Sequence, residues 1–283
     1  MASRIRLLAL DIDGTLLSPA FEVSQRDLSA VLRARAHGVE VILVTGRRHT
    51  FAMEIAALLG FDLWMITSNG AVTRSTAGES FHRELLSRGD ARRLIAHMED
   101  YRHQAVITFD KDHKGALVLE SYSGVADSIG RWLDRNSQFV DFVVPLEACL
   151  SEDPIQLMFC GTIPQMAQAE RQLMLLNARY TGFTILKTVY PVRDLCLLDV
   201  LNGNCSKGKT LARWARHRGL EPSEVMAIGD NYNDIEMLEY VGCPVIMGNA
   251  SEELKGRGWA ETLGNHQHGV AAAVEKYILD ANN

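Results

Sequence analysis

The chain has 283 residues, of which 47% are hydrophobic and 23% charged, and this composition is typical of a globular protein with one large or two ordinary domains. A formal net charge of −6, without any run of lysines or arginines, argues against general nucleic-acid binding. The five cysteines are scattered and form no C-x-x-C pair, which predicts reduced thiols in a cytoplasmic-type compartment. The first apolar run is too short to cross a membrane, so we expect neither export nor a membrane partner.

The first predicted strand, residues 5–10, is almost entirely apolar, as expected of a strand buried on both faces of a parallel sheet. It is followed directly by Asp11, Asp13 and Gly14. Since residues i and i+2 of an extended segment point to the same side, Asp11 and Asp13 should project together beyond the carboxyl end of the strand. Open α/β sheets bind their ligands at that edge.

Two βαβ units follow this strand. Their predicted elements are a helix from the N-cap Ser24 to Gly38, a strand at 39–44, a helix at 49–60 and a strand at 63–67. The second strand ends at Thr45-Gly46-Arg47-Arg48. Right-handed crossovers bring the carboxyl ends of these strands to the same edge of one sheet.

The pattern changes near residue 81. A helix at 88–103 precedes two alternating strands at 105–109 and 116–120, and further helix and strand segments continue to about residue 186. Helices interleaved with paired short strands indicate an α+β module. We predict an inserted cap domain at 82–190, with residues 1–81 and 191–283 forming the core.

The α/β pattern then resumes. The predicted elements are a strand at 194–200, a helix from the N-cap Ser206 to His217, strands at 225–228 and 244–247, and a final helix at 269–279. The strand at 225–228 ends in Gly229-Asp230-Asn231-Tyr232-Asn233-Asp234. The fold class that we predict is α/β, a doubly wound parallel sheet (a Rossmann-like core) with an inserted α+β cap.

Polar side chains therefore gather at one edge of the predicted sheet. The clusters are Asp11 with Asp13, Thr45 with Gly46, Lys207, and Asp230 with Asn233 and Asp234. Converging carboxylates repel one another, and a hard divalent cation such as Mg²⁺ relieves that repulsion. A hydroxyl and backbone N–H groups near a helix start suit an anion, and a lysine suits phosphate oxygens. Lys209 is the alternative to Lys207.

A phosphate and a carboxylate repel each other strongly at such a site. A phosphate dianion about 4 Å from an aspartate is repelled by roughly 8 kcal/mol at an effective dielectric constant of about 20. We therefore expect Mg²⁺ and Lys207 to neutralise the approach, with strict dependence on a divalent metal. Asp11 can then attack phosphorus and form an aspartyl-phosphate, while Asp13 protonates the departing oxygen and later accepts a proton from water.

Four stretches resemble, in chain order, the four motifs of the haloacid dehalogenase superfamily. They are Asp11-Ile12-Asp13-Gly14-Thr15-Leu16, Val44-Thr45-Gly46-Arg47, Ser206-Lys207-Gly208 and Gly229-Asp230-Asn231-Tyr232-Asn233-Asp234. Three further stretches are similar to its Cof-type phosphatases, the branch with a large α/β cap (type C2B): Ser68-Asn69-Gly70-Ala71, Met247-Gly248-Asn249-Ala250 and His268-Gly269-Val270-Ala271. The resemblance implies a phosphatase whose cap sets substrate specificity.

The resemblance also implies a role for each matching residue. Asp11 would be nucleophile and metal ligand, and Asp13 would be the acid/base and give its backbone carbonyl to the metal. Asp230 would be the remaining protein ligand of Mg²⁺, with Asp234 holding the ligands in place. The implied phosphate-binding residues are Ile12, Thr45, Gly46, Lys207 and Asn233. Because Asp13 is an acid, cleavage of carbon–halogen bonds is disfavoured.

We expect a small phosphorylated metabolite as substrate, sugar phosphates first, with the cap closing to exclude water and contact the leaving group. Two alternatives stay open. A phosphomutase would use the same pair of aspartates but return the phosphoryl group to a sugar, and a regulatory or binding protein would keep the site with little turnover. Arg47 and Arg48 stay open between a substrate contact and a surface role.

Overall fold

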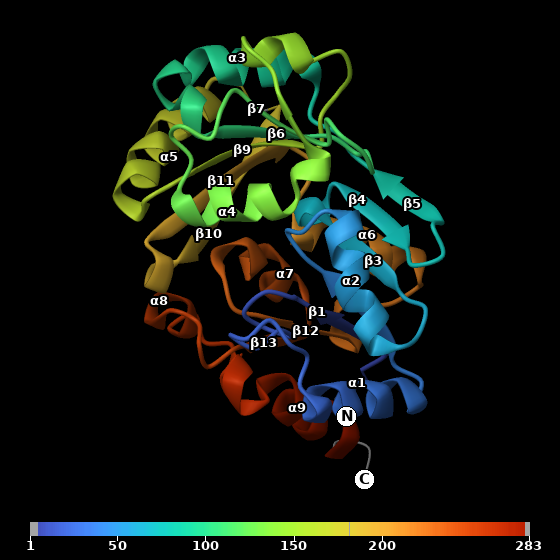
Figure 1. The fold of residues 1–283 in the computed structure, drawn as a ribbon. Helices are drawn as coiled ribbons and strands as arrows, with labels where there is room; N and C mark the ends of the chain where they lie inside the picture. Colours follow the sequence, from blue (N-terminus) through green and yellow to red (C-terminus); the bar gives the residue numbers. More distant parts are fainter. Residues whose placement is uncertain (1–4, 181, 281–283) are drawn as a thin grey trace. The chain divides into compact units, whose positions relative to one another are not determined.

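The computed structural model describes residues 5–180 and 182–280 (Figure 1). The chain divides into two compact units. Unit 1 comprises Met1–Arg83 and Ser206–Asn283, and unit 2 comprises Glu84–Cys205. Each unit is built around a sheet of its own, so the polypeptide leaves unit 1 once and returns to it once.

Unit 1 contains an eight-stranded sheet. Its strands are β1 Leu7–Leu10, β2 Glu40–Val44, β3 Trp64–Thr67, β4 Val72–Ser75, β5 Ser80–Arg83, β12 Val225–Gly229, β13 Cys243–Ile246 and β14 Ala260–Glu261. They lie in the order β14-β13-β12-β1-β2-β3-β4-β5. The six strands from β14 to β3 are parallel, and β4 and β5 extend the sheet as antiparallel strands.

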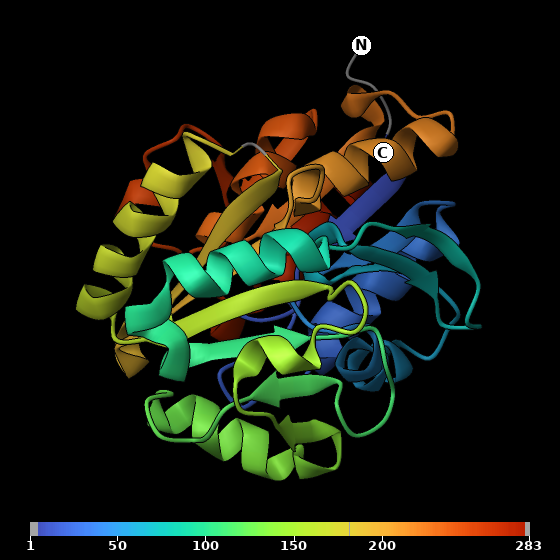
Figure 2. The ribbon, with the colours of Figure 1, turned by 90° about the horizontal axis from the view of Figure 1, so that it is seen from above.

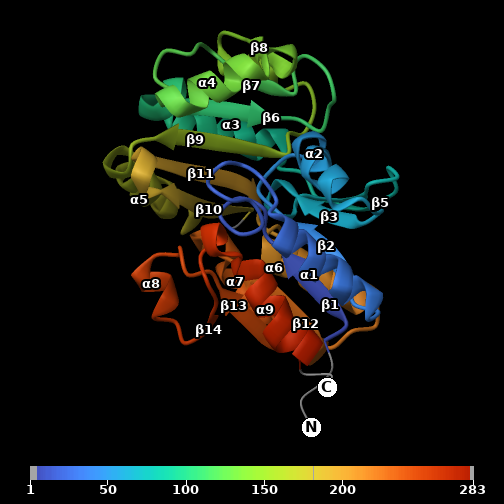
Figure 3. The same ribbon diagram turned by 60° about the horizontal axis from the view of Figure 1, so that its bottom comes forward.

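Helices cover both faces of this sheet (Figure 3). They are α1 Gln25–Ala36, α2 His49–Leu59, α6 Lys207–His217, α7 Ile235–Tyr240, α8 Glu252–Lys255 and α9 Gly269–Val274, with a π-helical segment, Glu275–Leu279, after α9. Successive residues of β1 point to opposite faces: Leu8 and Leu10 pack in the core with α1, α2 and α9, and Leu7 and Ala9 pack with α6 and α7. This explains why β1 is apolar throughout, and it confirms the doubly wound α/β core.

The hairpin of β4 and β5 was not anticipated from the sequence, which carried no predicted element between residues 68 and 81. Its strands read Val-Thr-Arg-Ser and Ser-Phe-His-Arg, so they lack the apolar run of the buried parallel strands. β5 lies at the edge of the sheet and pairs with β4, while β4 lies between β3 and β5. Short strands without an apolar run are difficult to distinguish from a loop by pattern alone.

Unit 2 contains a six-stranded sheet in the order β10-β11-β9-β6-β7-β8. Its strands are β6 Ala105–Thr108, β7 Leu117–Leu119, β8 Val140–Phe142, β9 Gln156–Gly161, β10 Phe183–Tyr190 and β11 Leu195–Asn202. All neighbouring pairs are antiparallel except β7 and β8. Its helices are α3 Arg88–His97, α4 Asp127–Arg135 and α5 Ile163–Asn177.

One face of the unit 2 sheet carries the main core of this unit. Leu94 of α3 and Leu173 of α5 pack there with Ile107, Phe159 and Leu198 from three neighbouring strands. Figure 2 shows α3 crossing in front of the strands, and in Figure 1 α4 lies on the opposite side of the sheet from α3. The α+β character predicted for the inserted module is therefore present.

The end of the insert differs from the predicted boundary at residue 190. β11, expected at 194–200 as a strand of the core, pairs instead with β10 and β9 in unit 2, and the chain returns to unit 1 at Ser206. β11 is almost continuously buried because it lies inside the sheet. Its sequence therefore resembles that of a buried parallel strand, and the apolar run did not distinguish the two cases.

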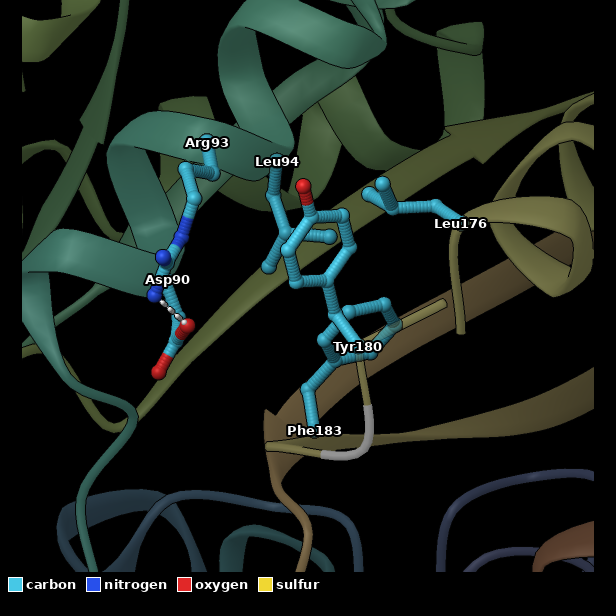
Figure 4. A pocket seen from close by; sticks show the side chains of 6 residues that line it. All are labelled: Asp90, Arg93, Leu94, Leu176, Tyr180 and Phe183. Atoms are coloured by element: carbon cyan, nitrogen blue, oxygen red, sulfur yellow. Dashed lines mark hydrogen bonds and ion pairs between the residues drawn. The ribbon is translucent and has the colours of Figure 1, made fainter. Parts of the chain in front are cut away.

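A shallow pocket in unit 2 lies beside α3 and the end of α5 (Figure 4). It is lined by Asp90, Arg93, Leu94, Leu176, Tyr180 and Phe183. The charged groups of the pocket contact other residues of α3 and its N-cap. The carboxylate of Asp90 accepts hydrogen bonds from the N-cap hydroxyl of Ser87 and from an Nη of Arg93, each within 2.6 Å. None of the predicted site residues lines this pocket.

The five cysteines are free thiols. None of the helices in residues 5–180 and 182–280 combines the length and apolarity that a membrane crossing requires.

Candidate active site

Four loops lead away from the carboxyl ends of neighbouring parallel strands in unit 1. They are residues 11–17 after β1, 45–48 after β2, 68–70 after β3 and 230–234 after β12. Because these strands are adjacent and parallel, the loops start from one edge of the sheet, where α/β proteins bind ligands. The predicted site residues of the sequence motifs lie in these loops, except Lys207, which begins α6.

Lys207 lies between two carboxylates. Its side chain is only 1% exposed, and Nζ donates to Oδ1 of Asp11 and Oδ1 of Asp234, each at 2.6 Å. The hydroxyl of Ser206 caps α6 by accepting the N–H of Lys209, which fixes Lys207 as the first residue of the helix. Lys209 is exposed, so Lys207 is the lysine that reaches Asp11.

Asp234 uses both of its carboxylate oxygens within the protein. Oδ1 accepts from Lys207, while Oδ2 accepts the backbone N–H groups of Asp230 and Asn231, each at 3.0 Å. A Cβ at position 229 would lie 2.6 Å from Cγ of Asp234, so this close approach requires Gly229. Asp234 therefore acts as a brace between the lysine and the loop that carries Asp230.

Asp230 faces the loop that follows β1. Its Oδ1 accepts the hydroxyl of Thr15 at 3.1 Å. Gly14 has φ of 85°, and a Cβ there would lie 2.2 Å from Oδ2 of Asp230. The glycine is thus required both by the backbone conformation and by the carboxylate. Sequence analysis did not single out Thr15 as a site residue, although it lies within the first motif.

Burial and charge oppose each other in this cluster. Burial raises the pKa of Asp11 to about 7, against the effect of the Lys207 ammonium, and the charges of Asp234 and Asp13 raise it further. Burial, followed by the charges of Asp11 and Asp234, also raises the pKa of Asp230 well above its usual value. Burial lowers the pKa of Lys207, but the two carboxylates that it contacts raise this pKa by more, so the net change is upward. Three carboxylates and one ammonium carry a formal charge of −2, which one divalent cation would balance.

The donor set suits Mg²⁺. Oxygen atoms of Asp11, Asp230 and Asp234 lie within 4.8 Å of one another. Within the described part of the chain, no hydrogen-bond donor contacts Oδ2 of Asp11, Oδ2 of Asp230 or the backbone oxygen of Asp13. Carboxylate and carbonyl oxygens are the ligands that hard cations prefer. Asp11, Asp13 and Asp230, the ligands that the sequence predicts, would hold the ion, while Asp234 is occupied by other partners.

Asp13 is bound by Arg47. Nε and Nη2 of Arg47 donate to the two carboxylate oxygens of Asp13, each at 2.7 Å, and both side chains are partly exposed. This bidentate geometry is the strongest form of arginine–carboxylate contact. The sequence left Arg47 open between a substrate contact and a surface role. The guanidinium instead binds Asp13, a predicted catalytic residue.

The predicted phosphate site offers three donors near Asp11. The N–H groups of Ile12 and Gly46 have no acceptor among the described residues, and the hydroxyl of Thr45 accepts the N–H of Arg47 while donating to none of them. The N–H of Thr45 donates to Ile66 within the sheet at 2.8 Å, so the expectation of an exposed amide at Thr45 is wrong. Thr45 can offer only its hydroxyl, because β3 uses the amide.

Asn69 is a further residue of the site, and sequence analysis gave it no role. It is fully buried, and its Oδ1 accepts Nδ2 of Asn233 at 3.0 Å. A Cβ added to Gly46 would lie 3.2 Å from the same oxygen. Asn69 belongs to a stretch that was noted only for its family resemblance, although Asn followed by Gly is a pair that favours the left-handed backbone found there.

The chain is similar to known hydrolases along most of its length. The family model described as haloacid dehalogenase-like hydrolase matches residues 8–274. Phosphatase YwpJ of Bacillus subtilis is 28% identical over 97% of this chain and 100% of its own length. An HMP-PP phosphatase of Shigella flexneri is 30% identical over 88% of this chain and 86% of its own length.

The fold is shared with solved structures. A HAD subclass IIB sugar phosphatase superposes with a TM-score of 0.77 at 22% identity, covering 96% of this chain and 98% of that one. This likeness supports the Cof-type resemblance at the level of the fold. The chain therefore belongs to the haloacid dehalogenase-like hydrolase family, as one of its phosphatases.

Proposed function

We propose that the protein is a Mg²⁺-dependent phosphomonoester hydrolase that acts through an aspartyl-phosphate on small phosphorylated metabolites, with sugar phosphates as the first candidates. The observation that carries this proposal is the cluster of buried Asp11, Asp234 and Lys207 with half-buried Asp230, whose formal charge of −2 suits one divalent cation. Beside it lie the donors of Ile12, Thr45 and Gly46, which suit the oxygens of a phosphate.

In the first step, a carboxylate oxygen of Asp11 attacks phosphorus. The bond between phosphorus and the ester oxygen breaks, its electron pair goes to that oxygen, and Asp13 supplies the proton. In the second step, water attacks the aspartyl-phosphate, Asp13 takes the proton, and the carboxylate of Asp11 is released. Lys207 fixes one oxygen of Asp11 at 2.6 Å, which orients the nucleophile throughout.

Charge neutralisation is divided between the chain and the metal. Lys207 and the backbone donors would meet the phosphate charge from the protein side. When bound by Asp11, Asp13 and Asp230, Mg²⁺ would supply positive charge that lowers the repulsion between the nucleophile and the phosphate. Asp13 must give up at least one of its hydrogen bonds to Arg47 before it can carry the proton. Arg47 donates to both carboxylate oxygens, and an oxygen that bears the proton becomes a donor itself.

The substrate class follows from the named activities of the relatives and from the charge of the chain. The relatives are named as phosphatases, one of them for HMP-PP, and the chain carries no run of basic residues that would favour a nucleic acid. Small phosphorylated compounds are therefore the class to test. Sugar phosphates come first, and HMP-PP belongs in the same panel.

The test is phosphate release from a panel of sugar, nucleotide and small-acid phosphates, with and without Mg²⁺. We expect Mg²⁺-dependent release by the wild type, and a loss of at least about 10⁴-fold in Asp11→Asn, because the nucleophile is removed. Asp62→Asn, a change outside the site in unit 1, is the matched control. Full activity of Asp11→Asn, or release that persists in excess chelator, would disprove the mechanism. Conversion of a sugar phosphate to its isomer with little free phosphate would instead indicate a mutase.

A further inference from the structure

The segment that follows β3 has an unusual backbone. Ser68, Asn69 and Gly70 have φ of 49°, 53° and 105°, so three consecutive residues are in the left-handed region. Glycine adopts this conformation freely, but other residues incur a cost on the order of 1 to 3 kcal/mol each and keep it only where their surroundings impose it. The contacts of residues 68–70 therefore show what this conformation achieves.

The backbone of this segment connects two parts of the site. The N–H of Ser68 donates to the carbonyl of Arg47 at 2.7 Å, and the N–H of Asn69 donates to the carbonyl of Thr45 at 3.0 Å. On its other side, the carbonyl of Gly70 accepts the hydroxyl of Thr210 in α6 at 2.9 Å. The segment thus attaches the Thr45–Arg47 loop to the helix that begins with Lys207.

The same backbone brings the side chain of Asn69 between Gly46 and Asn233. Its Oδ1 accepts one N–H of Asn233 at 3.0 Å, and neither residue is more than 7% exposed. A carboxamide nitrogen carries two hydrogens. Because Asn69 takes one of them, the plane of the Asn233 amide is fixed, and its second N–H has no acceptor among the residues that the structure describes.

We propose that Asn69 is a positioning residue of the phosphate site: it orients the amide of Asn233 toward a phosphate oxygen and keeps Gly46 and Thr45 in register with Lys207. This inference rests on the proposed function. Asn69 contacts the site through the hydrogen bond from Asn233, so we expect its effect to pass through the amide of Asn233. It should therefore influence phosphate binding more than the chemical step.

Asn69→Gly tests the side chain without disturbing the backbone, since glycine accepts the left-handed conformation. We expect the KM for an ester substrate and the inhibition constant for inorganic phosphate to rise about three- to tenfold, as for the loss of one hydrogen bond, with a smaller change in kcat. Ser68→Gly is the matched control, because it introduces a glycine at the preceding left-handed position. The buried Ser68 hydroxyl has no hydrogen-bond partner in the described part of the chain, so its removal breaks no such bond. The phosphate inhibition constant of Ser68→Gly should stay at the wild-type value.

A double-mutant cycle shows whether Asn69 acts through Asn233. In an Asn233→Ala background, Asn69→Gly should change the inhibition constant by less than about twofold, because the coupled partner is gone. Asn69→Asp keeps an acceptor for Asn233 and tolerates the backbone, so it should restore part of the lost affinity at low pH, where added negative charge repels phosphate least.

Three results overturn the inference: wild-type phosphate affinity in Asn69→Gly, equal losses in Asn69→Gly and Ser68→Gly, or additive losses in the double mutant. Each leaves the proposed function intact as long as the wild type binds phosphate and hydrolyses esters. If the wild type does neither, the proposed function fails first. Thermal melting of all variants separates misfolding from loss of phosphate affinity.

Discussion

In each unit of the molecule a basic side chain contacts two carboxylates. The two clusters differ in the effect on the pKa of those carboxylates. In unit 2, Arg102 donates to Glu120 at 2.6 Å and to Glu147 at 2.9 Å, and the guanidinium holds the pKa of Glu147 below its usual value. In unit 1, Lys207 is shared by Asp11 and Asp234, yet burial raises the pKa of Asp11 to about 7.

The difference distinguishes a structural ion cluster from a site. The side chains of Arg102 and Glu147 keep 17% and 29% exposure, and Oε1 of Glu120 also accepts the N–H of Leu146, so these bonds hold loops of unit 2 together. The cluster around Lys207 holds a further carboxylate, the half-buried Asp230, whose charged form is disfavoured. Carboxylates kept in such a place are expected to serve a ligand or a reaction.

The largest effect that follows from this comparison concerns Lys207. Lys207→Met leaves Asp11, Asp230 and Asp234 without their ammonium, and we expect kcat for phosphate release to fall by at least about 10²- to 10³-fold. Lys209→Met changes an exposed lysine two positions away and should keep the wild-type rate. If kcat of Lys207→Met stayed within tenfold of the wild-type value, Lys207 would serve only the packing of the core.

The corresponding change in unit 2 should affect stability. Arg102→Met leaves Glu120 and Glu147 unpaired, and the free energy of unfolding should fall by roughly 2 to 3 kcal/mol, less than for a fully buried pair because Glu147 keeps 29% exposure. Calorimetry should show a melting temperature about 5 to 10 °C lower. The phosphate inhibition constant of the folded variant should be unchanged, and a large increase would show that the two clusters are not separate in function.

The smallest effect is a dependence of stability on pH and metal. Burial raises the pKa of Asp11 in the native state from its usual value of 3.8 to about 7, so between these values the native state binds a proton that the unfolded chain has released. The unfolding free energy of metal-free protein should therefore fall as pH rises through this window, by about 1 to 2 kcal/mol over the upper part of it. Glu147, whose pKa is lowered, contributes in the opposite direction at acidic pH.

Mg²⁺ should reverse this trend, because it binds the charged carboxylates and competes with protons. Melting temperatures measured in chelator and in Mg²⁺ at several pH values check the prediction. The stabilisation by Mg²⁺ should grow with pH, and it should be lost in Asp230→Asn. Equal melting temperatures with and without Mg²⁺ at every pH would contradict the metal site.

The sequence predicts those parts of the molecule whose physical cause is local or strictly periodic. The apolar run of β1, followed by Asp11 and Asp13, placed two acids at the edge of a parallel sheet, and Ser206 was identified as the cap of α6. Periodicity did not reveal that β11 belongs to unit 2, because a buried central strand has the same pattern in either type of sheet. The contacts of Arg47 with Asp13 and of Asn69 with Asn233 join distant loops, and no spacing rule encodes them.

The pairing of β1 with β12 has a consequence for how the chain folds. Leu7 lies beside Val225, so the central strands of unit 1 meet only after a loop of about 200 residues has closed, at an entropic cost of roughly 5 kcal/mol. Unit 2 is continuous in sequence and can form within that loop, which shortens the span to be closed. We expect unit 2 to become protected from hydrogen exchange before β1 and β12 during refolding. The active site, which straddles β1 and β12, is then among the last features of the molecule to assemble.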